Sequence, residues 1–158
     1  MELKKYEGKN KEEILKKILK ELNCNQNDLF LKSEFIEGKL FKSSKYIVSV
    51  VTKKEIIEYC LTLKNTYKDC PFSDDFESVT MKHCENKKWF ALLMNVNERL
   101  YLNIKTDPNY SDILRNTYNY IMPAYHMNKE HWNTIIVDGK VDKTLVKELI
   151  EQSYQLTK

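Results

Sequence analysis

The segment from residue 123 to residue 134 gathers side chains that can bind ligands, move protons or hold a metal. It reads PAYHMNKEHWNT and contains two of the chain's three histidines, His126 and His131, and one of its two tryptophans, Trp132. The neutral hydrogen-bonding residues Asn128 and Asn133 lie among them. Neither the helical nor the strand period requires this mixture, so the segment is the first candidate for a functional site.

Metal binding is not favoured by this spacing. His126 and His131 are five residues apart, whereas the histidine pair of a zinc-binding helix is four apart on one face. A third ligand would have to come from His83 and Cys84. We therefore expect no metal and no cofactor, and we expect both histidines to donate to backbone carbonyls in a turn.

Nucleophilic catalysis has no clear signature either. The cysteines (Cys24, Cys60, Cys70 and Cys84) form no CxxC pair, and no GxSxG elbow is present. Asp74 and Asp75 follow Pro71 and Phe72, where turn formation explains them. With three glycines the chain has no glycine-rich phosphate loop. No catalytic residue is assigned, and an enzyme or small-molecule receptor that uses His126 and His131 is left as one alternative.

Nucleic-acid binding is the function that the polar residues support best. Lysines on the polar faces of strands, in a turn and in the histidine segment can hold phosphates, and amides and imidazoles can reach base edges. Such groups can serve DNA and RNA alike. The candidate binding residues are Lys82, Lys87, Lys88, Asn103, Lys105, His126, Asn128, Lys129, His131 and Asn133.

A protein-interaction or adaptor module is the main alternative. Tyrosine is favoured at interfaces because it offers a large contact area with little rotamer entropy. Five tyrosines cluster between residues 101 and 125: Tyr101, Tyr110, Tyr118, Tyr120 and Tyr125.

Charge is divided unevenly along the chain. Residues 1–52 hold 11 lysines against 8 acids, and residues 53–158 hold 15 basic against 15 acidic residues. The excess of +3 therefore lies in the first part. Proteins that wrap duplex DNA normally carry a basic excess, so the neutral second part must rely on a local basic patch.

The elements that position these residues follow from caps and periodicity. Asn10 and Glu13 predict a helix start, with an apolar stripe from Ile14 to Leu22. Strands are predicted at 2–7, 29–36 and 45–51, with a polar turn at 42–45. Thr52 and Glu55 predict the cap of a second helix, which follows the third strand with no flexible linker.

The second part is predicted to contain a meander of strands at 78–84, 89–96 and 100–105. Trp89 to Val96 is apolar on both faces and should be central. Asp107 and Pro108 begin a helix, residues 132–137 form a strand, 138–139 a turn, and Asp142 caps a last helix. This pattern predicts an antiparallel α+β sandwich, in two domains at 1–52 and 53–158.

The cysteines and the hydropathy of the sequence indicate where in the cell the protein is expected and whether it spans a membrane. Unpaired cysteines favour reduced thiols in a cytoplasmic protein. No apolar run approaches the roughly 18 residues of a membrane span, and residues 1–5 lack the apolar region of a signal peptide. The oligomeric state is not readable.

Residues 53–158 resemble the MmcQ/YjbR family. The histidine segment is the family's hallmark, and further blocks occur in the family's order: Pro71-Phe72 with Asp74-Asp75, residues 86–92, residues 102–108, Leu114-Arg115 and residues 153–156. The resemblance implies a small bacterial α+β protein of the kind described as DNA-binding, with a double-wing motif.

Residues 1–52 resemble the N-terminal domain of Jag proteins. Residues 6–13, the apolar helix after them and a strand pair around residues 38–41 carry this likeness. It implies a small β-α-β-β domain, which in that family precedes RNA-binding domains that do not follow here.

Overall fold

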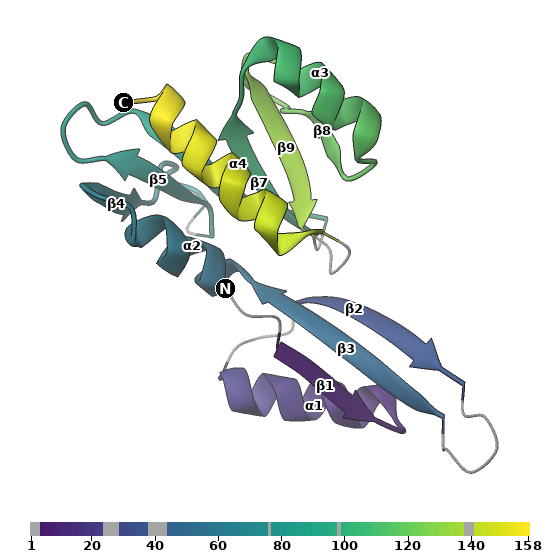
Figure 1. Cartoon of the computed structure of the whole chain (residues 1–158). Coiled ribbons are helices and arrows are strands. Elements are labelled where there is room, and N and C mark those ends of the chain that lie inside the picture. The colour runs from purple at the N-terminus through teal and green to yellow at the C-terminus, as the bar shows by residue number, and fades with distance from the viewer. Residues whose placement is uncertain (1–3, 24–28, 38–43, 76, 98, 138–140) are drawn as a thin grey trace.

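The computed structural model describes residues 4–23, 29–37, 44–75, 77–97, 99–137 and 141–158, and for residues 4–5, 29–34 and 47–51 the backbone alone. In this part of the chain the strands form two antiparallel sheets, one of three strands and one of six (Figure 1). The predicted α+β class is confirmed.

The three-stranded sheet has the order β1 (Lys4–Gly8), β3 (Lys45–Thr52), β2 (Leu29–Ile36). Helix α1 (Lys11–Leu22) begins after Asn10, whose side chain accepts a hydrogen bond from the Glu12 amide at 2.9 Å. Ile14 and Ile18 are buried with Tyr6. Helix α1 and strand β1 lie close together at Gly8. A Cβ atom at this position would lie only 2.9 Å from Ile14 Cγ1. Residues 42 and 43 of the predicted turn lie outside the described residues.

Strand β3 runs directly into α2 (Lys53–Leu61) through the predicted capping box. The Thr52 hydroxyl accepts from the Glu55 amide at 3.1 Å, and the Glu55 carboxylate accepts from the Thr52 amide at 2.9 Å. Two otherwise unpaired N–H groups are thereby satisfied at the helix start.

The six-stranded sheet has the order β4-β5-β6-β7-β9-β8. Its strands are β4 (Thr66–Asp69), β5 (Val79–His83), β6 (Trp89–Val96), β7 (Arg99–Lys105), β8 (Ile121–Pro123) and β9 (Trp132–Val137), and its helices besides α2 are α3 (Pro108–Thr117) and α4 (Lys143–Leu156). The predicted strands and helices are present, and β6 is interior. Strands β4 and β8 were not predicted, because they have only four and three residues, too few to show a period. The predicted turn at 138–139 lies outside the described residues.

The helices α2, α3 and α4 pack against one face of this sheet. Met81, Leu93 and Leu102 of the sheet share one buried cluster with Ile56 of α2, Leu114 of α3 and Leu149 of α4. Figure 1 shows α4 lying across β7 and β9. We call this side the core face.

Residues on the opposite side of the six-stranded sheet are found from the register, since directly paired residues of antiparallel strands share a face. Leu92 pairs with Asn103, and Asn103 pairs with Thr134. Leu92 and Ile136 on this side lie outside the buried cluster that contains α2, α3 and α4. We call this side the open face, although its middle is closely packed: Leu92, Asn103 and Thr134 are at most 5% exposed.

Candidate nucleic-acid interface

Several predicted binding residues meet at one end of the six-stranded sheet. Because neighbouring strands are antiparallel, β5 ends where β6 begins, and β7 ends where β9 begins. Lys82 accordingly pairs with Trp89, and Lys105 pairs with Trp132. Residues 84–88, Lys105 and residues 124–131 therefore lie at the same end, which we call the basic end.

The histidine segment is a closed loop between β8 and β9. The Ala124 amide donates to the Trp132 carbonyl at 3.0 Å. The Asn128 carbonyl accepts from the amides of His131 and Trp132 at 3.2 and 2.9 Å, and the Asn128 side chain accepts from the Glu130 amide at 2.9 Å. These bonds give the loop a defined backbone, so its exposed side chains start from fixed positions.

Arg115 of α3 ties this loop to the sheet. Its Nη2 donates to the Lys129 carbonyl at 2.5 Å, and its Nε donates to Asn133 Oδ1 at 2.6 Å. Asp112 lies 3.7 Å from Nη1. Sequence reasoning assigned Arg115 no role. The available signal was its place one turn after Ser111, on the side of α3 that faces the sheet.

Two of the predicted binding residues are buried: Asn103, expected on the polar face of a strand, and Asn133, expected to reach base edges. The expectation that their side chains project into solvent is wrong. Asn103 is 2% exposed and accepts a hydrogen bond from the Thr134 hydroxyl. Asn133 is fully buried, and its amide nitrogen donates to Ser111 Oγ at 2.9 Å and to the Thr106 hydroxyl. Their polar atoms complete networks inside the protein, so an external ligand cannot reach them in this structure.

The remaining candidates of the loop and turn lie at the surface. Lys87, Lys88, His126, Asn128 and Lys129 are exposed. His126 has a φ of 62°, in the left-handed region, and its ring lies 4.0 Å from the exposed ring of Tyr125. His131 and Lys105 are half-buried, and His131 Nε2 lies 3.9 Å from the Glu130 carboxylate.

The lysines differ in their electrostatic partners. Lys82 forms an ion pair with Asp69 at 2.5 Å, and its Nζ lies 5.6 Å from the centre of the Trp89 ring. Lys82 is therefore less available to phosphates than expected. Within the described residues, the ammonium groups of Lys105 and Lys129 take part in no ion pair.

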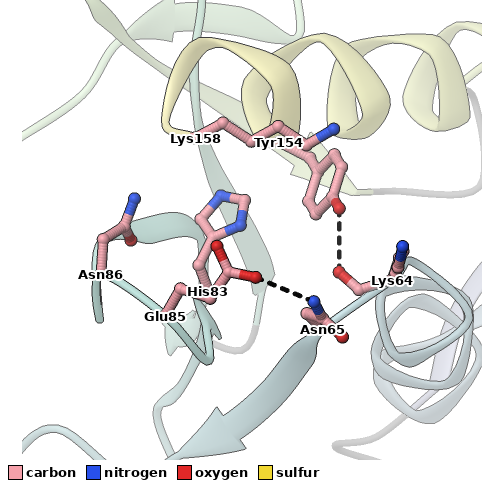
Figure 2. Close-up of a pocket in the computed structure, with 7 residues that line it drawn as sticks. All are labelled: Lys64, Asn65, His83, Glu85, Asn86, Tyr154 and Lys158. Carbon is pink, nitrogen blue, oxygen red and sulfur yellow. Dashed lines mark hydrogen bonds between the residues drawn. The ribbon is translucent and has the colours of Figure 1, made fainter.

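A pocket of about 280 Å³ opens beside the turn at 84–88. Figure 2 shows the His83 ring close to Tyr154, with lysine and amide side chains around the opening. His83 is buried, packs 4.7 Å from the Tyr154 ring, and Nε2 lies 2.8 Å from the Thr157 hydroxyl. The lining residues are Lys64, Asn65, His83, Glu85, Asn86, Tyr154 and Lys158.

Burial lowers the pKa of His83, and the cations Lys158 and Lys88 lower it further. The Tyr154 backbone and Glu85 act in the opposite direction. Glu85 is held by Asn65, whose amide nitrogen donates to it at 3.0 Å. The pocket thus contains a buried imidazole whose protonation is disfavoured, under a rim of mixed charge.

Metal and thiol chemistry find no centre in the parts of the chain that are described. No group of three or more histidine, cysteine, aspartate or glutamate side chains is close enough to hold a metal there. Cys60 is buried, which raises the pKa of its thiol to about 12, while Cys70 and Cys84 are exposed free thiols. Among the described helices, none is long and apolar enough to cross a membrane.

The family of the chain follows from its sequence relatives. The YjbR family model matches residues 61–156, which include the basic end and the histidine segment. The chain belongs to the YjbR family. Residues 4–52, which contain the first sheet, lie outside the matched range.

Two other proteins are similar to this chain in sequence. YyaQ of Bacillus subtilis (strain 168) is 37% identical over 119 residues, covering 69% of this chain and all of YyaQ. YjbR of Escherichia coli (strain K12) is 27% identical over 105 residues, covering 66% of this chain and 86% of that protein.

Two solved structures are also similar. A crystal structure of a Pseudomonas syringae protein has a TM-score of 0.64 and 31% identity, covering 68% of this chain and all of that one. A Deinococcus radiodurans protein described by domain family DUF419 has a TM-score of 0.59 and 31% identity, over 65% of this chain and 75% of that one.

Proposed function

We propose that this YjbR-family chain is a non-catalytic nucleic-acid-binding protein that contacts its ligand through the basic end of the six-stranded sheet. The supporting observation is that cations from three separate segments meet there: Lys87 and Lys88 from the turn after β5, Lys105 from the end of β7, and Lys129 from the loop before β9. These four lysines stand against the carboxylates of Glu85 and Glu130 in the same segments, which leaves a local positive excess of the kind that a neutral domain needs to hold phosphates.

The two projecting segments at this end have different roles in the proposal. Residues 84–88 and 124–131 act as the two wings, and their lysines neutralise phosphates. Asn128 Nδ2 and the His131 ring are the remaining groups for base edges, because Asn133 is buried. DNA is the preferred ligand, with RNA as the alternative.

The first sheet supplies additional positive charge. We assign residues 1–52 a Jag-N-like fold, which the element order β1-α1-β2-β3 supports, and the same residues carry the excess of +3. In this proposal the unit assists binding through its charge and makes no base contacts.

Titration of labelled oligonucleotides at two salt concentrations tests the proposal. Lys105→Ala and Lys129→Ala should each weaken binding to all sequences and reduce the salt slope by about one unit, because each removes one phosphate contact. Lys82→Ala should have a smaller effect on this slope, since its ammonium is already paired with Asp69.

Lys54→Ala is the control for a lysine away from the basic end; its ammonium lies 3.8 Å from the exposed Glu58 carboxylate. Lys54 is an exposed lysine near the start of α2, and its neighbour Lys53 contacts the Glu77 carbonyl ahead of β5, at the opposite end of the sheet. Salt-independent binding, or no binding tighter than about 100 μM, contradicts the proposal.

A protein-interaction role is the second candidate, favoured by the 76% exposure of Tyr125 in a well hydrogen-bonded loop. Tyrosine in such a position is typical of interface anchors. If nucleic acid fails to bind, this role takes precedence.

A further inference from the structure

A row of alternating aromatic and lysine side chains crosses the open face beside the basic end. Tyr67 of β4 pairs with Lys82 of β5, and Lys82 pairs with Trp89 of β6. On the other side of β6, Lys105 of β7 pairs with Trp132 of β9. We call these five residues the aromatic row.

The β6–β7 register joins the two halves of this row. Ala91 pairs with Ile104, so Trp89 and Lys105 both lie just beyond this pair at the basic end. The irregularity between Met81 and Lys82 lets Trp89 face Lys82. The row therefore extends over five adjacent strands.

The row is accessible and held in place. All five side chains are partly exposed. Lys82 Nζ lies 5.6 Å from the centre of the Trp89 ring, and Lys87 Nζ lies 5.0 Å from the centre of the Tyr67 ring. Next to the row, the buried Asn103–Thr134 hydrogen bond stiffens the sheet under it.

The side chains of the aromatic row indicate which of three ligands, a protein, duplex DNA or a single strand, fits this surface best. The centre of a protein interface is depleted of charged residues, whereas here a lysine stands between each pair of rings. Duplex DNA offers phosphates but keeps its bases stacked inside. A single strand offers both unstacked bases for the rings and phosphates for the lysines. Open sheets with exposed aromatic residues bind two or three bases in this way.

Strand spacing agrees with a single strand. Paired neighbouring strands lie about 4.8 Å apart, so Tyr67 and Trp89, two strands apart, are separated by roughly 10 Å. Between β6 and β7 the ladder ends at Ala91 and Ile104, and Ser153 Oγ bridges the Phe90 carbonyl and the Lys105 amide, so Trp89 and Trp132 lie farther apart than this. Lys82 and Lys105 lie in the intervals, where the backbone between two stacked bases would pass.

We infer that the open face binds single-stranded nucleic acid, with bases stacked on Tyr67, Trp89 and Trp132 and phosphates held by Lys105 and the neighbouring lysines. The inference rests on the proposed function and adds to it the strand state of the ligand and the surface that carries the bases.

Intrinsic fluorescence of the full chain tests this directly, because both tryptophans of the protein, Trp89 and Trp132, belong to the row. Titration with a 12-nucleotide oligothymidylate should quench the emission saturably. A 12-base-pair duplex should bind more weakly and quench less. Heparin, a polyanion without bases, should leave the emission nearly unchanged.

Substitutions separate stacking from charge. Trp132→Leu keeps apolar bulk but removes the large ring, and should weaken oligothymidylate binding roughly 5- to 150-fold. Trp132→Phe should recover most of the affinity. Tyr67→Leu is a second test on a strand far from Trp132. Phe72→Leu is the matched control, an aromatic residue 42% exposed in the loop at the other end of the β4–β5 pair.

The results distinguish the two proposals. Salt-sensitive binding with duplex preferred, or with Trp132→Leu and Tyr67→Leu both unchanged, overturns the single-strand inference and leaves the proposed function standing. Absence of salt-sensitive binding to any oligonucleotide overturns both. Quenching together with a loss confined to the row variants supports the inference.

Discussion

His83 is the residue whose protonation should affect the stability of this protein. Its imidazole is buried between Phe90 and Tyr154 and contacts the Thr157 hydroxyl. The pKa of His83 lies below its ordinary value of 6.5 in the folded chain, mainly through burial. The unfolded chain therefore takes up the proton more readily than the folded one, and folding is favoured where the ring is neutral.

The contribution of His83 is complete above its unfolded pKa and declines as pH falls from there towards the folded pKa. His83→Gln keeps a hydrogen-bonding side chain but cannot titrate. Between about pH 7.5 and pH 5.5 the free energy of unfolding should fall less in this variant than in the native chain. Urea unfolding at several pH values measures the difference. His126→Gln, at an exposed site, is the control, and equal acid dependence in native and His83→Gln proteins contradicts the prediction.

At the scale of elements, the junction between β3 and α2 depends on one cap. Thr52 and Glu55 satisfy each other's amides, and the Glu55 carboxylate also lies 4.0 Å from the buried Lys143 of α4. Desolvation lowers the pKa of Lys143, and Glu55 partly opposes this shift. One carboxylate thus serves the start of α2 and the packing of α4.

Thr52→Ala should lower the free energy of unfolding by ~1 kcal/mol, because an orphan amide at the helix start loses its acceptor. Thr62→Ala is the comparison at the other end of the same helix, where the exposed hydroxyl donates to the Tyr59 carbonyl. Its effect should stay within about 0.5 kcal/mol. Guanidinium unfolding measures both, and equal effects would show that the cap has no special role.

At the scale of the whole molecule, the unit containing the first sheet and the unit containing the second are predicted to unfold together. Strand β3 passes into α2 without a linker, and the smaller unit has only Tyr6, Ile14 and Ile18 in its described buried cluster. A unit of this length, residues 1–52, can bury only a modest core and is marginal alone.

Ile18→Ala tests the coupling. The lost packing should cost about 2–5 kcal/mol, and it should shift the unfolding transition seen by tryptophan fluorescence, although both tryptophans are in the second unit. Far-ultraviolet circular dichroism should give the same midpoint. Ile150→Ala in the second core is the positive control. A tryptophan transition that Ile18→Ala leaves in place would show that the two units unfold independently.

Local features of this protein were readable from its sequence because they depend on neighbours in the chain. The caps at Asn10, Thr52, Asp107 and Asp142 use side chains within a few residues of the amides that they satisfy. The alternation in β7 likewise placed Leu102 on the buried side. Strands β4 and β8 were too short to show a period.

Tertiary structure alone decided which candidate residues are available. Asn133 belongs to a polar segment, yet hydrogen bonds from Arg115 and to Ser111, both distant in sequence, make it part of the core. The aromatic row also depends on pairings between separate strands, such as Lys105 with Trp132. Periodicity assigns a residue to one face of its own strand, but strand order and register come from contacts between distant segments, and these determine which side chains meet.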